Sequence, residues 1–207
     1  MAPGGTPRLA TAAVEGDLDE AVLRRILDHL GISLRAVYGR KGKRFLLQSL
    51  NGYNNAARYA PWIVLVDLDR DCDCAPPCVE KWLARPSSGM CFRIAVRSIE
   101  AWLFADRERL ARLLGVSVGR LPAHPDGLDD PKKDLIDLAR RSRKGGIRDD
   151  LVPRHGSGRA VGPLYTTRMI EFLQDETAGW RLDRAVTVSE SLKRCVNRLR
   201  DLAGHSL

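Results

Sequence analysis

Apolar residues in the first hundred positions form runs and spacings that predict strands and helices in alternation. A short, mostly apolar run over residues 9–14 and a continuous apolar run over residues 62–66, closed by Asp67, predict strands buried on both faces, as the strands of a parallel sheet are. Between these runs, apolar residues recur at helical spacing over residues 17–30. Residues 32–38 and 91–96 are predicted to add two further strands.

Helical spacing and turn residues predict the remaining elements. Gly31 is placed to end the first helix, since glycine adopts the left-handed conformation that closes helices. Further helices are predicted over residues 45–50, 54–59, 79–83, 99–104, 107–114, 132–143, 165–173 and 189–203. Stretches that contain proline and glycine predict loops over residues 71–77 and 145–163.

The alternation of strands and helices predicts an α/β fold with a small, mostly parallel sheet flanked by helices. Residues 1–106 are assigned to this core, and residues 107–207 to a helical, basic C-terminal region packed on the core. In such sheets, functional groups collect at the carboxyl ends of the strands. Candidate chemistry is therefore expected at that edge.

Carboxylates at two strand ends are the clearest candidates for chemistry. Glu15 directly follows the first apolar run, and Asp67 and Asp69 close the run at 62–66. Residues two apart on a strand point the same way, so both aspartates can converge on one cation. Oxygen ligands of this kind suit Mg²⁺ or Mn²⁺, and a bound ion offsets the repulsion among carboxylates. The alternative is that the two aspartates merely cap a strand and its turn.

The chain is basic, with 34 Lys and Arg against 26 Asp and Glu, a net charge of +8. This balance favours an acidic partner, nucleic acid first. Basic residues and glycines interleave over residues 140–168, where backbone amides can approach phosphates; a solvated loop is the alternative. The candidate nucleic-acid-binding residues are Arg93, Arg97, Arg140, Arg141, Arg154 and Arg159. Arg93 and Arg97 are expected on one side of the fourth strand, where they contact phosphate or pair with the carboxylates.

Several classes of protein are disfavoured. No apolar run reaches the ~18 residues of a membrane helix, and residues 1–8 lack the pattern of a signal peptide. Five cysteines, an odd number, argue against a secreted disulfide framework, so we predict a cytoplasmic protein with reduced cysteines. Cys72, Cys74 and Cys78 are irregularly spaced for zinc and are interpreted as small loop residues. No GxxxxGK[ST] motif occurs, so ATP hydrolysis would require a separate partner.

Two segments carry a resemblance to a known family. Residues 14–20 (VEGDLDE) and 64–69 (VLVDLD) look like the two signature motifs of the Toprim domain, which topoisomerases, bacterial primases and OLD-family nucleases share. Over nearly the whole chain, the sequence more closely resembles a bacterial Toprim-related family similar to OLD-family nuclease domains. The segments of this closer resemblance are residues 93–106, 130–132 and 156–165. The resemblance implies a small α/β sheet whose Glu15, Asp67 and Asp69 bind Mg²⁺ and which acts on phosphodiester bonds.

Two further residues are candidates for the expected site. OLD-type nucleases are expected to hold two cations, so Glu100 is a candidate further metal ligand. The alternative for Glu100 is that it only complements the dipole of the helix it begins. Lys132 or Lys133 is a candidate to stabilise charge in a transition state, as nuclease lysines do, with a solvated helix start as the alternative.

The predicted function is a Mg²⁺- or Mn²⁺-dependent nuclease whose catalytic residues are Glu15, Asp67, Asp69, Glu100 and Lys132. DNA is expected rather than RNA. The resemblance to OLD-type nucleases implies a separate ATPase as partner, in genome defence or DNA processing. The alternative is a non-catalytic nucleic-acid- or partner-binding subunit that retains the acidic site. Topoisomerase-like strand chemistry is disfavoured, because no catalytic-tyrosine domain is evident in the 207 residues.

Overall fold

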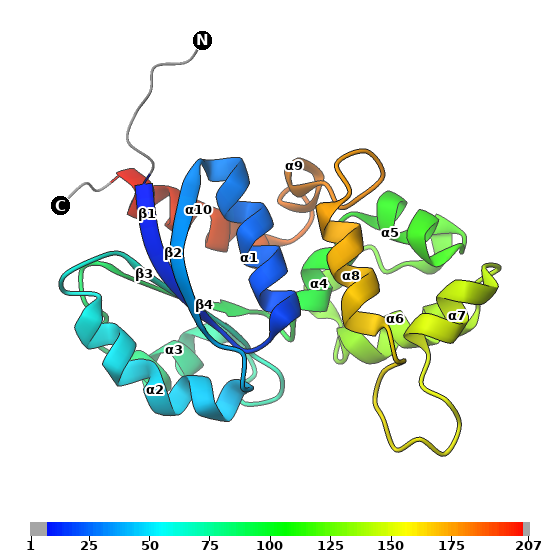
Figure 1. Ribbon diagram of the computed structural model, residues 1–207, viewed down its shortest axis with the longest axis horizontal. Coiled ribbons are helices and arrows are strands. Elements are labelled where there is room, and N and C mark those ends of the chain that lie inside the picture. The colour runs from blue at the N-terminus through cyan, green and yellow to red at the C-terminus, as the bar shows by residue number, and fades with distance from the viewer. Residues whose placement is uncertain (1–7, 205–207) are drawn as a thin grey trace, which may run out of the picture.

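The computed structural model describes residues 8–204, and its sheet has four strands that all run parallel (Figure 1). The strands are β1 (Arg8–Val14), β2 (Ile32–Gly39), β3 (Trp62–Asp67) and β4 (Met90–Ala95). Their order across the sheet is β2-β1-β3-β4, so β2 and β4 form its edges. All four carboxyl ends therefore lie at one end of the sheet. The predicted α/β fold with a parallel sheet flanked by helices is confirmed.

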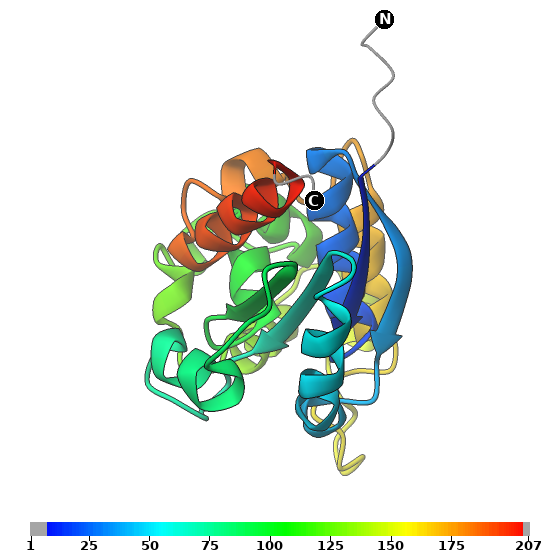
Figure 2. The ribbon, with the colours of Figure 1, turned by 90° about the vertical axis from the view of Figure 1, so that its left-hand side faces the viewer.

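Helices cover both faces of the sheet (Figure 2). α2 (Lys43–Ala56) and α3 (Ala75–Leu83) pack on one face, and α1 (Asp17–Leu30) and α10 (Glu190–Gly204) on the other. The remaining helices are α4 (Ile99–Phe104), α5 (Arg107–Leu114), α6 (Pro131–Arg140), α7 (Gly145–Leu151), α8 (Tyr165–Gln174) and α9 (Leu182–Ala185), with 3₁₀ turns at Val118–Arg120 and Pro125–Gly127. Within residues 8–204, no helix is long and apolar enough to cross a membrane.

The side chains of β1 alternate between two cores, as the side chains of a buried strand must. Ala12 and Val14 contribute to the core under α1, and Ala13 contributes to the core under α2. The first core continues beyond the sheet: Trp180 Nε1 donates a 3.0 Å hydrogen bond to the carbonyl of Trp102, and neither indole is exposed. One core therefore extends from the sheet into the C-terminal helices.

α1 has the predicted bounds, and Gly31 ends it with φ 67°. α2, in contrast, runs unbroken where two short helices were predicted at 45–50 and 54–59. The glycine that suggested a break, Gly52, is exposed and weakens a helix by about 1 kcal/mol without ending it. The buried side chains of Leu46 and Leu50 anchor this helix to the sheet.

Both loops predicted from proline and glycine are wrong in part. α3 begins at Ala75, inside the predicted loop 71–77, because prolines fit the first turn of a helix, where no backbone N–H is needed. α7 lies inside the predicted loop 145–163. Its Ile147 and Leu151 are buried one helical turn apart, which is the apolar spacing that the neighbouring glycines obscured in the sequence.

The prediction of fully reduced cysteines is also wrong. Cys72 and Cys78 form a disulfide that ties the loop after β3 to α3, with 6.0 Å between their Cα atoms. Cys74 is free and exposed, and Cys91 and Cys195 are free and buried. An odd number of cysteines means that at least one is unpaired, but it does not exclude a disulfide between two of the others. Cys72 and Cys78 meet because the loop after β3 lies against α3.

Candidate functional site

Four carboxylates gather at the carboxyl end of the sheet. Glu15 follows β1, Asp67 ends β3, Glu100 lies in the first turn of α4 and Asp19 in the first turn of α1. Asp19, Asp67 and Glu100 are only 7%, 8% and 1% exposed. These three line a pocket of about 220 Å³ together with Lys132 and several α1 and α8 residues. The cluster thus joins segments from both halves of the chain.

Backbone amides fix the positions of two of the four carboxylates. The N–H of Asp67 donates a 2.7 Å hydrogen bond to Glu15 Oε1, which joins the ends of the neighbouring strands β1 and β3. The N–H of Ile99 donates a 2.9 Å hydrogen bond to Asp67 Oδ1. Asp67 is therefore held between a strand end and the first turn of α4, where a helix favours negative charge.

Burial and repulsion between neighbouring carboxylates make Asp67, Asp19 and Glu15 hard to ionise. Burial, followed by the charges of Asp19 and Glu100, raises the pKa of Asp67 well above its ordinary value. Burial and the Glu15 carboxylate raise the pKa of Asp19 to about 7. Burial likewise raises the pKa of Glu15. Near neutral pH, the cluster therefore retains protons unless another positive charge replaces them.

Two carboxylate oxygens in the cluster accept no hydrogen bond although they are buried: Asp19 Oδ1 and Glu100 Oε2. The other oxygen of Glu100 accepts a 3.0 Å hydrogen bond from the Tyr165 hydroxyl and lies 3.4 Å from Lys132 Nζ. Burial and the Glu100 charge raise the pKa of Tyr165 well above its ordinary value, so its hydroxyl remains a donor. Oxygens left unpaired in this way are suited to a hard cation.

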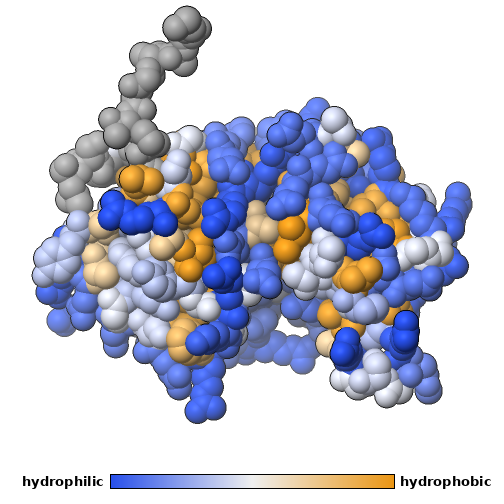
Figure 3. Space-filling view, viewed as in Figure 1, coloured by the Kyte–Doolittle hydropathy of each residue, from blue (hydrophilic) through white to orange (hydrophobic). Residues whose placement is uncertain are grey.

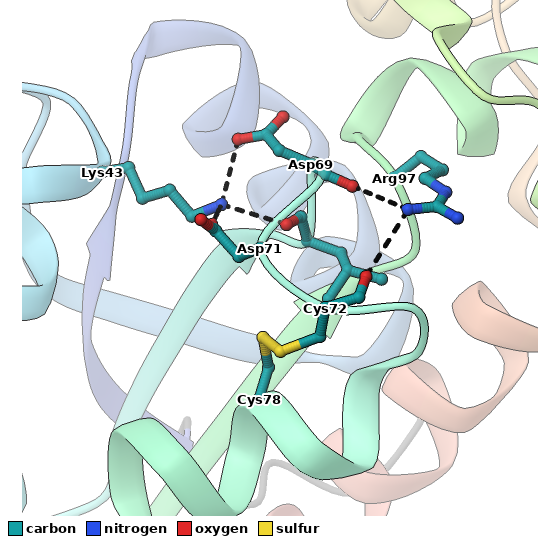
Figure 4. The surroundings of a disulfide bond; sticks show 7 residues. Lys43, Asp69, Asp71, Cys72, Cys78 and Arg97 are labelled. Atoms are coloured by element: carbon teal, nitrogen blue, oxygen red, sulfur yellow. Dashed lines mark hydrogen bonds and ion pairs between the residues drawn. A yellow bond between two sulfur atoms is a disulfide. The ribbon is translucent and has the colours of Figure 1, made fainter.

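These carboxylates nevertheless do not form a complete metal-binding site in this structure. Within residues 8–204, no group of three His, Cys, Asp or Glu side chains is placed to hold a metal ion as it stands. Asp69 accounts for part of this result, because its carboxylate points to Lys43 Nζ at 2.9 Å (Figure 4). Lys43 also donates to the carbonyl of Leu68 at 3.2 Å and pairs with Asp71. Asp69 is thus neutralised beside the cluster rather than within its pocket.

A second pocket, of about 470 Å³, adjoins the first. Its lining includes Lys43, Asp69, Arg97 and Lys132, and Lys132 borders both pockets. The Lys132 side chain is 48% exposed, and the Glu100 charge raises the pKa of its ammonium group. A charged, half-exposed lysine that borders both pockets can contact an anion that spans them.

The two arginines expected on one side of β4 are separated. Arg97 lies beyond the end of β4 in a left-handed conformation with φ 57°, and its Nη1 donates a 3.0 Å hydrogen bond to the carbonyl of Asp69. Asp69 has φ 49° and donates its own N–H to the carbonyl of Arg97 at 2.7 Å. This left-handed turn breaks the alternation of the strand. Arg93 lies earlier in β4 and lines a different pocket, between α3 and α10.

The basic residues from 140 to 168 also divide into groups. Arg154 and Arg159 are exposed on a loop that projects beyond the carboxyl end of the sheet in both views (Figures 1 and 2). Figure 3 shows hydrophilic and near-neutral residues on this loop, hydrophobic residues beside it, and an indentation between the loop and the side of α2. Arg140 and Arg141 lie at the other end of α6 from Lys132. Arg168 pairs with Asp150 at 2.7 Å and so stabilises the fold locally.

Sequence reasoning missed three residues of this region: Asp19, Lys43 and Tyr165. Asp19 could have been found from its spacing, because one helical turn after the strand end brings residue 19 back beside Glu15. Lys43 stands in the basic stretch 39–44, where no candidate site was predicted. No local signal marks Tyr165, whose partner Glu100 is 65 positions away.

Comparison with known proteins yields no relative. Protein-family models, curated proteins and solved structures were all compared with this chain, and none matches. The resemblance to the Toprim domain is carried by the motifs of the sequence, and the candidate site by its geometry.

Proposed function

We propose that the protein is a Mg²⁺- or Mn²⁺-dependent nuclease of Toprim type. The observation that carries this proposal is the buried cluster of Asp19, Asp67 and Glu100, in which two carboxylate oxygens have no partner. Buried carboxylates are costly when neither paired nor bound to a cation. Their place at the carboxyl end of a parallel sheet is where such folds bind ligands.

The residues that would hold the cation are Glu15, Asp19, Asp67 and Glu100, with Asp69 joining them on exchange of Lys43 for the ion. When bound, the ion would polarise a phosphate oxygen and lower the pKa of an attacking water. Tyr165 orients Glu100 through the 3.0 Å hydrogen bond. Lys132 and Arg97 line the adjoining pocket and would bind non-bridging phosphate oxygens.

Nucleic acid, DNA in particular, is the proposed substrate. The net charge of +8 and the exposed Arg154 and Arg159 beside the same end of the sheet support a polyanionic partner. A separate ATPase that controls access is proposed as a partner from the resemblance to OLD-type nucleases. The proposed setting of this activity is genome defence or DNA processing.

The pairing of Asp69 with Lys43 favours one alternative, a non-catalytic subunit that binds nucleic acid or a protein partner. The two functions differ in metal binding. In a nuclease, the cation displaces protons from Asp67 and Asp19, so its affinity rises with pH. In a non-catalytic subunit, binding of nucleic acid is independent of Mn²⁺.

The deciding experiment combines Mn²⁺ titration by calorimetry with cleavage of labelled single-stranded and duplex DNA. Wild-type protein should bind Mn²⁺ with proton release and cleave DNA, whereas Asp67→Asn should lose both, by about a hundredfold or more. The matched control is Asp137→Asn, the same chemical change in a half-buried residue on α6 outside both pockets. Equal cleavage by wild type and Asp67→Asn would indicate a contaminating nuclease and leave the non-catalytic alternative.

A further inference from the structure

A groove of about 650 Å³ runs along the outer edge of β4 and shares no lining residue with the two pockets of the candidate site. α3 forms one wall and α10 the other, on either side of β4 at the open side of the sheet (Figure 2). β4 is an edge strand, so one row of its backbone groups has no neighbouring strand.

The pattern of hydrogen bonds shows which backbone groups face the groove. In a parallel pair, alternate residues direct both backbone groups to the same neighbour. Trp62 and Leu68 donate their N–H groups to the carbonyls of Gly89 and Ala95, so the odd-numbered residues of β4 face β3. The even-numbered residues 90, 92, 94 and 96 therefore face outward.

The N–H groups at both ends of this outward-facing row donate hydrogen bonds, whereas those in the middle do not. The N–H of Met90 donates to the carbonyl of Ser87 at 2.9 Å, and the N–H of Val96 donates to Ser191 Oγ at 3.0 Å. Between them, the N–H groups of Phe92 and Ile94 have no hydrogen-bond partner within residues 8–204. Backbone donors in such a place are satisfied by another strand or by solvent.

The two walls differ in chemistry. The α3 wall presents the apolar Val79 and Leu83 beside the exposed Glu80, and the side chain of Ile94 packs in the core on that side. On the α10 side, Arg93 lines the groove and interacts with the Cys195 thiol, but its Nε is buried without a hydrogen-bond partner. The acidic residues of that wall are already engaged, since Asp126 accepts hydrogen bonds from Ser189 Oγ and the Ser191 N–H, and Glu190 pairs with Arg194. The charge of Arg93 is therefore not balanced by the acidic residues of that wall, and its Nε can still donate to an incoming carboxylate.

We propose that this β4-edge groove binds an extended segment of a partner protein by strand addition. The segment pairs with the backbone of Phe92 and Ile94. Because side chains alternate along a strand, its residues point in turn toward Val79 and Leu83 of the α3 wall and toward Arg93. The recognised pattern is therefore an apolar residue alternating with an acidic one. This surface is independent of the carboxylate cluster and requires no metal.

The test uses a capped, fluorescein-labelled hexapeptide of alternating valine and glutamate, titrated with the protein and followed by fluorescence anisotropy. Arg93→Gln should weaken its binding about tenfold, because a charge-assisted contact is lost. A hexapeptide with glutamine in place of glutamate should bind weakly to both proteins. Arg200→Gln, the same change at an exposed α10 position outside the groove, should leave the affinity unchanged.

A second measurement tests directly whether the peptide pairs with the backbone of β4. Hydrogen exchange measured by NMR should slow at the Phe92 and Ile94 amides when the peptide binds, and a peptide N-methylated at alternate residues should not bind. Absence of binding, or binding that leaves these two amides unchanged, would overturn the proposal. Competition by free glutarate at concentrations similar to the peptide would also overturn it, because it would indicate a pocket for small carboxylates.

Discussion

Asp19 is a buried carboxylate in the first turn of α1, and burial together with Glu15 raises its pKa to about 7. A carboxyl group with a higher pKa in the folded state binds its proton more tightly there. The free energy of unfolding therefore falls as pH rises from 3.8, the ordinary value, to about 7. Above that window the ionised Asp19 opposes folding until a cation offsets its charge.

Asp19→Asn should remove this penalty. In metal-free buffer, the melting temperature of the variant relative to wild type should be higher at about pH 9 than at about pH 5, because only the wild type is ionised at residue 19 in alkali. Thermal unfolding followed by circular dichroism measures the difference. Asp28→Asn, at an exposed position of the same helix, is the control. An identical shift at both pH values would contradict the assigned electrostatics.

At the same scale, the sequence indicated where the candidate site lies but not its full composition. Glu15 and Asp67 were predicted from their places at strand ends, and both lie in the acidic cluster. The direction of Asp69 was not predictable, because it depends on a left-handed turn shared with Arg97, 28 residues later. Contacts between distant segments leave no periodic signal in either segment.

At the scale of elements, the loop that follows β3 is held at three points (Figure 4). Lys43 of α2 binds Asp69 and Asp71, Arg97 donates to the carbonyls of Asp69 and Cys72, and the disulfide joins Cys72 to Cys78. Two of these attachments are polar and partly exposed, so they resist unfolding little by themselves. The covalent bridge is the attachment with a definite entropic effect.

Replacing both Cys72 and Cys78 with serine should lower the free energy of unfolding by about 2 kcal/mol, since a short closed loop restricts the unfolded chain. Urea unfolding of the double variant against wild type measures this value. Cys74→Ser changes a free, exposed thiol of the same loop and should have little effect. If the double variant and Cys74→Ser are equally stable, the bridge does not constrain the unfolded chain.

Elements with strong apolar periodicity were predicted almost to the residue, as α1, α4 and α5 show. Errors occurred where glycine or proline was given too much weight against buried residues. α2 passes through Gly52 because Leu46 and Leu50 are anchored in the core. Local propensity is a weak term, and tertiary burial overrides it.

At the scale of the whole molecule, positive charge lies beside the carboxyl end of the sheet. Charge reversal of both Arg154 and Arg159 should weaken DNA binding and lower the slope of log affinity against log salt by about two, because fewer counterions are released. Anisotropy titrations at several salt concentrations measure this slope. Reversal of Arg58 and Arg85, exposed arginines that precede β3 and β4, is the matched control. An equal loss for both pairs would indicate a general charge effect without a binding face.

The order of the strands in the sheet also could not be predicted from the sequence, because it depends on contacts between distant segments. Alternating strands and helices indicate a parallel sheet, but the order β2-β1-β3-β4 depends on which apolar surfaces pack together in space. The packing of α10 on β4 joins segments about a hundred residues apart: Ser191 Oγ accepts hydrogen bonds from the Val96 N–H and from Trp102 Nε1. Such pairings are set by shape and not by pattern.

The position of α10 has a consequence for synthesis on the ribosome. All four strands leave the exit tunnel early, yet Cys91 and Ala95 of β4 belong to a core that α10, the last described helix, completes. While the intervening residues are being translated, this part of the sheet has no cover. A nascent chain stalled before residue 190 therefore exposes an apolar strand, and chaperones that recognise such surfaces should bind it until release.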